Sequence, residues 1–296
     1  MNPPSLPGIH FFKMTGTGND FILIDNRSGS LDADHCQDLV RRACRRKLSV
    51  GADGMILIEN DPEVDFRWRF FNADASEAEM CGNGSRCAAR FAYLTGIVSK
   101  PQMSFRTLAG IIRAELLDNT VKVQMTPPYG LHLDLVVEAE GRSFRLDFIN
   151  TGVPHAVSFA ADESELESVD VQRWGKALRF HPQFQPAGTN VNFVYIQDPR
   201  HIVVRTYERG VEDETLACGT GAMASTLISA ARDRVVSPVE VRTRSGESLT
   251  IHFELSRIPP SDTAEFREVF LQGEARVVYE ADLWPDTIQS QMQAPA

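Results

Sequence analysis

Apolar residues in the first part of the chain fall in short runs separated by glycine-rich or polar breaks, a pattern that predicts strands. A strand begins at residue 11, breaks at residues 16–20 and resumes at 21–25. Two more apolar segments follow at residues 55–59 and 65–71. Between residues 25 and 55, the segment 32–47 has apolar residues at helical spacing, and Cys36 and Cys44 are most simply packing residues of that helix.

The middle and second half of the chain repeat this plan. Residues 103–159 contain several strand-like segments, and residues 163–179 contain a helix with Trp174 on its buried face. Further strands are expected in these ranges: 193–196, 201–207, 239–243, 248–254 and 269–279. Polar loops precede two glycine-rich turns, one in each half of the chain.

Each of those turns places a cysteine directly before Gly-x-Gly and a helix-compatible run. The first copy reads MCGNGSRC at residues 80–87, and the second reads ACGTGA at residues 217–222. Cys218 follows Cys81 by 137 residues, and the same shift pairs Glu214 with Glu77 and Tyr207 with Phe70. The repeat predicts a pseudo-symmetric pair of lobes, since two copies are too few for a solenoid.

Composition places the chain among ordinary globular proteins. It has 296 residues, 43% hydrophobic and 24% charged, which suits two domains or one two-lobed unit. The net charge of −10 disfavours a nucleic-acid partner. No apolar run is long enough for a membrane span, and the N-terminus lacks the pattern of a secretory signal, so we expect a cytoplasmic protein.

The cysteine and histidine patterns exclude other kinds of site. Five cysteines form an odd number in a long chain, which favours thiols over a disulfide framework. There is no CxxC pair and no histidine pair at zinc-ligand spacing, so no metal site is expected.

Two cysteines at helix starts support acid/base chemistry. Unpaired N–H groups and the helix dipole lower the pKa of a thiol at a helix N-terminus, and the same N–H groups attract carboxylates. One thiolate could then remove the proton from an α-carbon while the opposite thiol delivers another. That reaction is racemisation or epimerisation by two bases.

Three other interpretations compete with this one. Cysteines at tight turns are often core residues, but the duplication argues for function. A thiol peroxidase or disulfide oxidoreductase is disfavoured by the absence of CxxC. A pyridoxal enzyme would need a Schiff-base lysine with a phosphate cup, and neither glycine-rich turn has a lysine beside it.

Three motifs resemble diaminopimelate epimerases: GTGNDF at residues 16–21, FNADASEAEMCGNGSRC at 71–87 and YERGVEDETLACGTG at 207–221. The resemblance runs from about residue 9 to about residue 283. It implies a cofactor-independent isomerase that interconverts L,L- and meso-diaminopimelate in lysine and peptidoglycan precursor synthesis. It also implies an α/β (α+β) fold of two similar lobes, each a curled, mostly antiparallel sheet around a central helix, with the active site in the cleft.

On this resemblance the N-terminal lobe spans residues 9–127 and carries Cys81, and the C-terminal lobe spans 128–283 and carries Cys218. The C-terminal strands could return to the N-terminal lobe, and residues 284–296 form a tail. The partners expected are a small-molecule substrate, diaminopimelate, and a second copy of the chain in a homodimer, with no nucleic acid and no membrane.

The resemblance assigns roles residue by residue. Cys81 and Cys218 are the base and acid pair. Glu208 meets an amino group of the substrate or tunes the thiols, and His155 adjusts their pKa values. The substrate-binding residues are these: backbone amides of Gly82, Asn83, Gly219 and Thr220 for the carboxylate at the reacting centre; Asn72, Asn190 and Arg209 for the distal carboxylate; and Asn19 in the first binding loop.

Two positions depart from the family pattern. Val153 stands where the family often has asparagine, and Gly54 stands where some members have glutamine, so both contacts would be absent. Tyr279 matches a position linked to dimer contacts in the family, although a buried residue within the lobe is equally compatible with the sequence.

A proline or hydroxyproline racemase is the nearest alternative enzyme, and Arg209 argues instead for a longer substrate with two carboxylates. A non-catalytic relative that keeps the fold is a second alternative, although both cysteines are present. A redox-active role is the third, because two thiols that flank one carbon could form a disulfide on oxidation.

Overall fold

The structure, a computed structural model, describes residues 8–31, 33–258 and 263–284. The chain divides into two compact units. The first comprises the residues up to Val123 and those from Glu274 onward, and the second comprises Gln124–Gly273. From residue 285 on, the predicted tail lies outside the described residues.

The strands of the first unit pair side by side in one sheet. In order of pairing they are β17 (Arg276–Leu283), β1 (Ile9–Gly16), β2 (Asn19–Asp25), β3 (Gly54–Glu59), β4 (Phe66–Asn72), β5 (Gln102–Thr107), β6 (Gly110–Leu117) and β7 (Thr120–Gln124). The pairs β2–β3 and β4–β5 are parallel and the others are antiparallel.

Two helices pack against this sheet. The amphipathic helix α1 (Ala33–Ala43) buries Cys36 and Val40 against Ile22 and Met55 of β2 and β3, with Cys44 just beyond its end in the same core. Helix α2 (Gly82–Leu94) contacts β1, β2, β3 and β6. Strand β3 is buried along almost its whole length and β2 in its centre, as strands covered on both faces should be.

The second unit has a sheet of the same kind. Its strands, in order of pairing, are β8 (Tyr129–Ala139), β9 (Arg142–Asn150), β10 (Pro154–Phe159), β11 (Asn190–Asp198), β12 (His201–Glu208), β14 (Val239–Arg242), β15 (Ser248–Ile258) and β16 (Thr263–Glu274). Only β10–β11 and β12–β14 in this series are parallel, and the short β13 (Asp213–Thr215) pairs with the end of β12.

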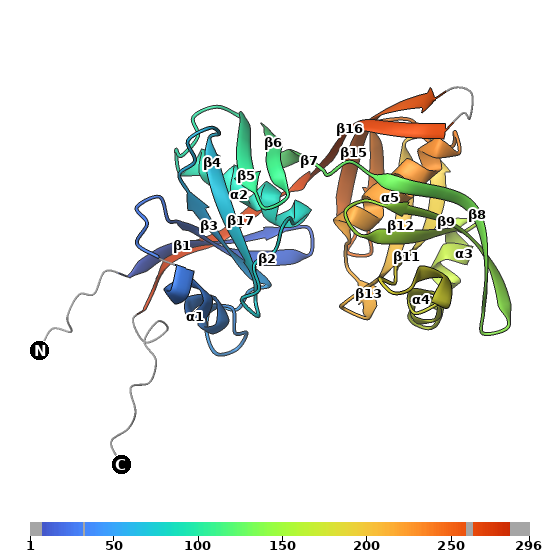
Figure 1. The fold of residues 1–296 in the computed structure, drawn as a ribbon, viewed down its shortest axis with the longest axis horizontal. Coiled ribbons are helices and arrows are strands. Elements are labelled where there is room, and N and C mark those ends of the chain that lie inside the picture. Colours follow the sequence, from blue (N-terminus) through green and yellow to red (C-terminus); the bar gives the residue numbers. More distant parts are fainter. Residues whose placement is uncertain (1–7, 32, 259–262, 285–296) are drawn as a thin grey trace, which may run out of the picture. The chain divides into compact units, whose positions relative to one another are not determined.

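Helix α5 (Gly219–Ala231) lies inside the curled strands of this unit (Figure 1). Its sequence contains no charged residue, and every residue from Gly221 to Ala231 is buried. A helix without a polar face must be covered on all sides, and α5 contacts six strands. Helices α3 (Glu163–Ser168) and α4 (Val171–Arg179) and the 3₁₀ turn η1 (Pro182–Phe184) pack on a separate apolar cluster with β11 and β12.

The 137-residue repeat holds at the level of whole elements. Shifted by that number, the bounds of α2 become those of α5, and β3, β4 and β5 fall on β11, β12 and β14. The predicted fold class is therefore confirmed: two similar α/β units, each a mostly antiparallel sheet that curls around one helix. Within the described residues, no helix has the length and apolar character that crossing a membrane requires.

The structure refines two expectations and decides against one alternative. The single strand expected over residues 269–279 is two, because Ala275 separates β16, which pairs with β15, from β17, which pairs with β1. The helix expected within 163–179 is also two, because Val169 is extended and the carboxylate of Asp170 caps a new helix. Tyr279 is not buried, since its side chain on β17 is 42% exposed.

Candidate active site

Cys81 is the N-cap residue of α2. Its backbone is extended, with φ −147° and ψ 117°, and its Sγ accepts a hydrogen bond from the backbone N–H of Gly84 at 3.4 Å. The motif produces this geometry because small residues follow the cysteine, so the first helical turn can close over the sulfur. The thiol is half-buried, as a group that must meet a ligand should be.

Cys218 occupies the same position at the start of α5. Its φ of −128° and ψ of 107° nearly repeat those of Cys81, and its Sγ lies 3.5 Å from Thr220 Oγ1. Burial and, to a lesser extent, the negative charge of Glu208 raise the pKa of the Cys218 thiol to about 12. The Thr220 hydroxyl and the backbone N–H groups of Thr220 and Gly221 act in the opposite direction. At neutral pH Cys218 is therefore a protonated thiol.

The two helix starts are suited to anions. The first turns of both helices lie wholly within the described residues and contain no acidic side chain that would occupy the N–H groups. Gly82, Asn83, Gly219 and Thr220, the residues predicted to bind a carboxylate, lie in these first turns. The helix dipoles add partial positive charge at the same points.

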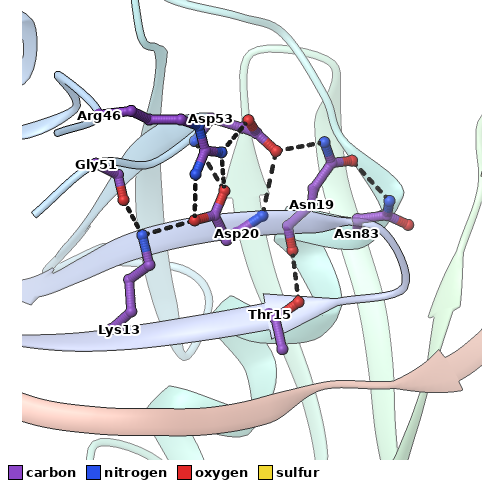
Figure 2. Close-up of polar contacts among 8 residues, drawn as sticks. All are labelled: Lys13, Thr15, Asn19, Asp20, Arg46, Gly51, Asp53 and Asn83. Carbon is purple, nitrogen blue, oxygen red and sulfur yellow. Dashed lines mark hydrogen bonds and ion pairs between the residues drawn. The ribbon is translucent and has the colours of Figure 1, made fainter. Parts of the chain in front are cut away.

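Asn19 and Asn83 come together at the start of α2 (Figure 2). Asn83 Nδ2 donates to Asn19 Oδ1 at 2.8 Å and to the carbonyl of Thr17 at 3.1 Å. Asn83 Oδ1 accepts from the guanidinium of Arg86 at 2.9 Å, and Asn19 Nδ2 donates to Asp53 Oδ2 at 2.9 Å.

The two groups at the ends of this series of hydrogen bonds fix the direction of every bond in it. Arg86 can only donate and the ionised carboxylate of Asp53 can only accept, so neither amide between them can be flipped. The side chain of Asn83 is thereby engaged within the protein, which leaves its backbone N–H for a ligand. Asn19 Nδ2 has a second N–H beyond the one that binds Asp53, and this N–H can donate a further hydrogen bond.

Ion pairs hold Asp53 from behind. Arg46 contacts Asp53 Oδ1 at 2.7 Å and also pairs with Asp20, which in turn contacts Lys13 Nζ at 2.7 Å (Figure 2). Burial by itself would raise the pKa of Asp20, but hydrogen bonds from Arg46 and Lys13 lower it overall. The carboxylates behind Asn19 are thus tied to two cations.

Gly54, the first departure from the family pattern, lies at the start of β3. A Cβ atom there would lie 2.5 Å from the carbonyl oxygen of Phe71 and 2.7 Å from the ring of Phe70. Position 54 therefore accepts no side chain in this protein. Asn72, at the exposed end of β4, donates from Nδ2 to Ser76 Oγ at 3.0 Å.

Asn190 and Arg209 are neighbours in the second unit. Asn190 donates to the carbonyl of Pro154 at 3.0 Å and accepts from the backbone N–H of Arg209 at 2.8 Å, so its amide orders the turn after β12. The guanidinium of Arg209 uses one N–H on the carbonyl of Ala187 at 2.9 Å. Within the part of the chain that the structure describes, its other N–H groups make no hydrogen bond and can bind a planar anion.

Glu208 and His155 lie in the same unit. Burial raises the pKa of Glu208, and its charge acts on Cys218. His155 on β10 is fully buried, and burial together with the charge of Arg209 lowers its pKa to about 3. His155 is therefore neutral at pH 7. Val153, the second departure, precedes it and carries no polar group.

Sequence reasoning did not identify Asp53, Arg46 and Asn192 as supports of the candidate site, where Asn192 Nδ2 lies 3.1 Å from His155 Nδ1. No local motif marks them as such, because Asp53 meets Asn19, and Asn192 meets His155, only after segments 34 and 37 residues apart have come together. Arg46 then joins Asp53 from the turn after α1. A buried asparagine in a strand is the one signal that could have directed attention to Asn192.

Solved structures share this fold at low sequence identity. A phenazine biosynthesis protein of the PhzF family from Bacillus anthracis matches with a TM-score of 0.69 and 14% identity, over 94% of this chain and all of that one. A hydroxyproline epimerase from Agrobacterium vitis matches with a TM-score of 0.66 and 18% identity, over 95% of this chain and 94% of that one. These likenesses concern the fold alone.

Sequence comparison is more specific. A family model for diaminopimelate epimerase matches residues 11–131 and 148–256. The diaminopimelate epimerase of Aquifex aeolicus is 47% identical over 95% of this chain and 100% of its own length. That of a Hydrogenobaculum species is 45% identical over 92% of this chain and 97% of its own length. Over matches of this extent, the chain belongs to the diaminopimelate epimerase family.

Proposed function

We propose that this protein is a cofactor-independent isomerase that converts L,L-diaminopimelate to meso-diaminopimelate, a step in lysine and peptidoglycan precursor synthesis. Family membership and relatives of that name at 35–47% identity support the reaction. The observation that carries the mechanism is the pair of matched N-caps, in which Cys81 and Cys218 begin helices of the same length with nearly the same backbone angles.

In this mechanism one cysteine thiolate takes the α-proton and the opposite cysteine thiol gives a proton to the other face of the carbon. Burial and the charge of Glu208 keep Cys218 protonated. In the direction of reaction in which the Cys81 thiolate is the base, Cys218 is therefore the acid. After the transfer, Cys81 carries the proton and Cys218 is the thiolate. The reverse reaction uses the same two groups in exchanged roles.

We assign the substrate contacts according to the roles that the family resemblance implies. Backbone N–H groups of Gly82, Asn83, Gly219 and Thr220 bind the carboxylate at the reacting carbon, where negative charge builds up as the proton leaves. Asn72, Asn190 and Arg209 bind the distal carboxylate, and Asn19 donates one further hydrogen bond. Glu208 and His155 tune the thiols. The location in the cytoplasm and the homodimer, with Tyr279 at its contact, remain predictions, and light scattering of the purified protein tests the dimer.

The deciding experiment uses purified protein without added pyridoxal phosphate in deuterated water. We expect deuterium to enter the α-position of diaminopimelate as L,L and meso forms interconvert. Cys81→Ala and Cys218→Ala should each lower interconversion by about 10³-fold or more, since each removes a general acid or base. Cys36→Ala, in the buried face of α1, is the matched control and should retain activity.

Interconversion at the wild-type rate in either active-site variant would refute the two-base mechanism. A proline- or hydroxyproline-type racemase is the second candidate, because such proteins share the fold at 18% identity. Parallel assays on proline and diaminopimelate distinguish the two, and Arg209 favours the substrate with a distal carboxylate.

A further inference from the structure

His155 is a buried histidine with one ring nitrogen in use. Its Nδ1 lies 3.1 Å from Asn192 Nδ2, whereas its Nε2 is enclosed and has no hydrogen-bond partner among the described residues. A buried polar atom without a partner is costly, so a native protein that keeps one generally has a reason for it.

The hydrogen bonds of Asn192 determine which ring nitrogen carries the proton. Asn192 Nδ2 also lies 3.0 Å from the carbonyl oxygen of Ala156, which can only accept, so the amide nitrogen must be on that side. On the other side, the hydroxyl of Thr206 donates to Asn192 Oδ1 at 2.9 Å. Asn192 therefore donates to His155 Nδ1, and in the neutral ring the proton sits on Nε2.

The same amide packs under the first turn of α5. A Cβ atom at Gly221 would lie 2.4 Å from Asn192 Oδ1 and 3.3 Å from Cys218 Cβ. The group that orients His155 is thus in contact with the turn that begins with Cys218. A shift in either would be transmitted to the other.

We propose that Asn192 is a positioning residue that holds His155 in its Nε2–H form, so that the imidazole offers a neutral hydrogen-bond donor to an anion of the reaction. The proposal rests on the function proposed above and gives it a further part. In this form His155 donates a hydrogen bond to a thiolate, and so adjusts its pKa, or to a carboxylate. It does not exchange protons with the substrate.

The surroundings of His155 keep it neutral. Ile149 faces it from β9 and Asn190 from β11, and the sequence of α5 contains no charged residue. Arg209 supplies the charge that acts on the ring, and this charge opposes a second proton, as burial does. The donor is therefore available throughout the neutral pH range.

Nitrogen-15 NMR of the histidine rings tests the assignment without any mutation. The His155 signal is identified by its loss in His155→Gln. In the wild type we expect protonated Nε2 and unprotonated Nδ1, unchanged between pH 5 and pH 8. A proton on Nδ1, or a titration in that interval, would overturn the proposal.

Asn192→Asp provides the second test, because the carboxylate has the same shape but can only accept. It should draw a proton to Nδ1, raise the pKa of His155 so that the ring titrates, and lower kcat/KM by about 10- to 100-fold, the range for one hydrogen bond to a charged group. A loss in kcat with an altered pH profile points to the thiolate as the acceptor, and a rise in KM points to the substrate carboxylate.

Asn150→Asp is the matched control, because Asn150 Oδ1 accepts from the backbone N–H of Gly152 and a carboxylate can do the same. It should leave activity within about twofold of the wild type, as a change that keeps its hydrogen bond usually does. Wild-type kinetics in folded Asn192→Asp would contradict the proposal. Failure of the wild type to epimerise diaminopimelate would instead refute the proposed function, while the NMR result would still decide the tautomer.

Discussion

The first turns of α2 and α5 share a backbone but have different neighbours. Each starts with an extended cysteine and ends 13 residues on, and the two bounds differ by the 137 residues that separate Cys81 from Cys218. At the equivalent position on the preceding strand, Phe71 is buried in the apolar cluster that α1 covers, whereas Glu208 acts on the second cysteine. The repeated scaffold thus presents two thiols in the same way, and the neighbouring residues make their surroundings unequal.

The difference extends into the helices. Arg86 in α2 is fully buried and binds Asn83, and the equivalent residue in α5 is Met223, also fully buried. The first turn of α2 is therefore held by charged and amide groups, and that of α5 by apolar packing together with the amide of Asn192. A two-base epimerase needs one acid and one base at any moment, so unequal surroundings suit its two thiols.

Gly84 and Gly221, the second glycines of the two Cys-Gly-x-Gly motifs, provide the strongest test of this comparison. A Cβ at Gly84 would meet Ile56 and Trp68 at 3.3 and 3.4 Å, distances that small shifts relieve, whereas at Gly221 it would overlap Asn192 Oδ1. Gly221→Ala should displace Asn192 and lower kcat/KM by about 100-fold, as misplacement of about 1 Å near a reacting group does. Gly84→Ala should cost only a few-fold, and equal losses in steady-state assays would contradict the comparison.

A smaller effect is expected from making the first helix resemble the second. Arg86→Met leaves the oxygen of the Asn83 side chain and the carbonyl of Glu274 without their buried donor. We expect the free energy of unfolding to fall by about 2 kcal/mol. Urea unfolding measures it, and Arg106→Met, which removes more exposed ion pairs with Asp61 and Glu63, should lower it by less. An Arg86→Met protein as stable as the wild type would show that the two helix starts are interchangeable.

The smallest effect concerns Glu208, because its equivalent in the first half of the chain, Phe71, has no carboxyl group. Because the folded pKa of Glu208 is raised by burial, its contribution to stability is present below the unfolded pKa and is lost as pH rises through the folded pKa. Glu208→Gln should therefore gain stability relative to the wild type as pH rises from about 4 to 7. Thermal unfolding across that interval measures the difference, and a constant offset would show that burial does not perturb this carboxyl group.

Local sequence signals predicted the elements that carry the thiols. Glycine next to cysteine marked both helix starts, and alternating apolar residues marked most strands, because caps and periodicity depend on neighbours along the chain. The structure departed from the sequence-based expectations where the pairing partners of a strand determine its bounds or its exposure. Ala275 ends one strand because its two flanks pair with different strands, and Tyr279 is exposed because of where β17 lies in its sheet.

By itself, the sequence determined that two matched cysteine helices exist, which strands surround them and which family they resemble. The hydrogen bond from Asn192 to His155 and the bond from Asn19 to Asp53 join residues 37 and 34 positions apart. Only the tertiary structure decided these contacts. The physical reason is that the direction of a hydrogen bond depends on which donors and acceptors strand pairing brings within about 3 Å, and no local pattern of residues encodes that register.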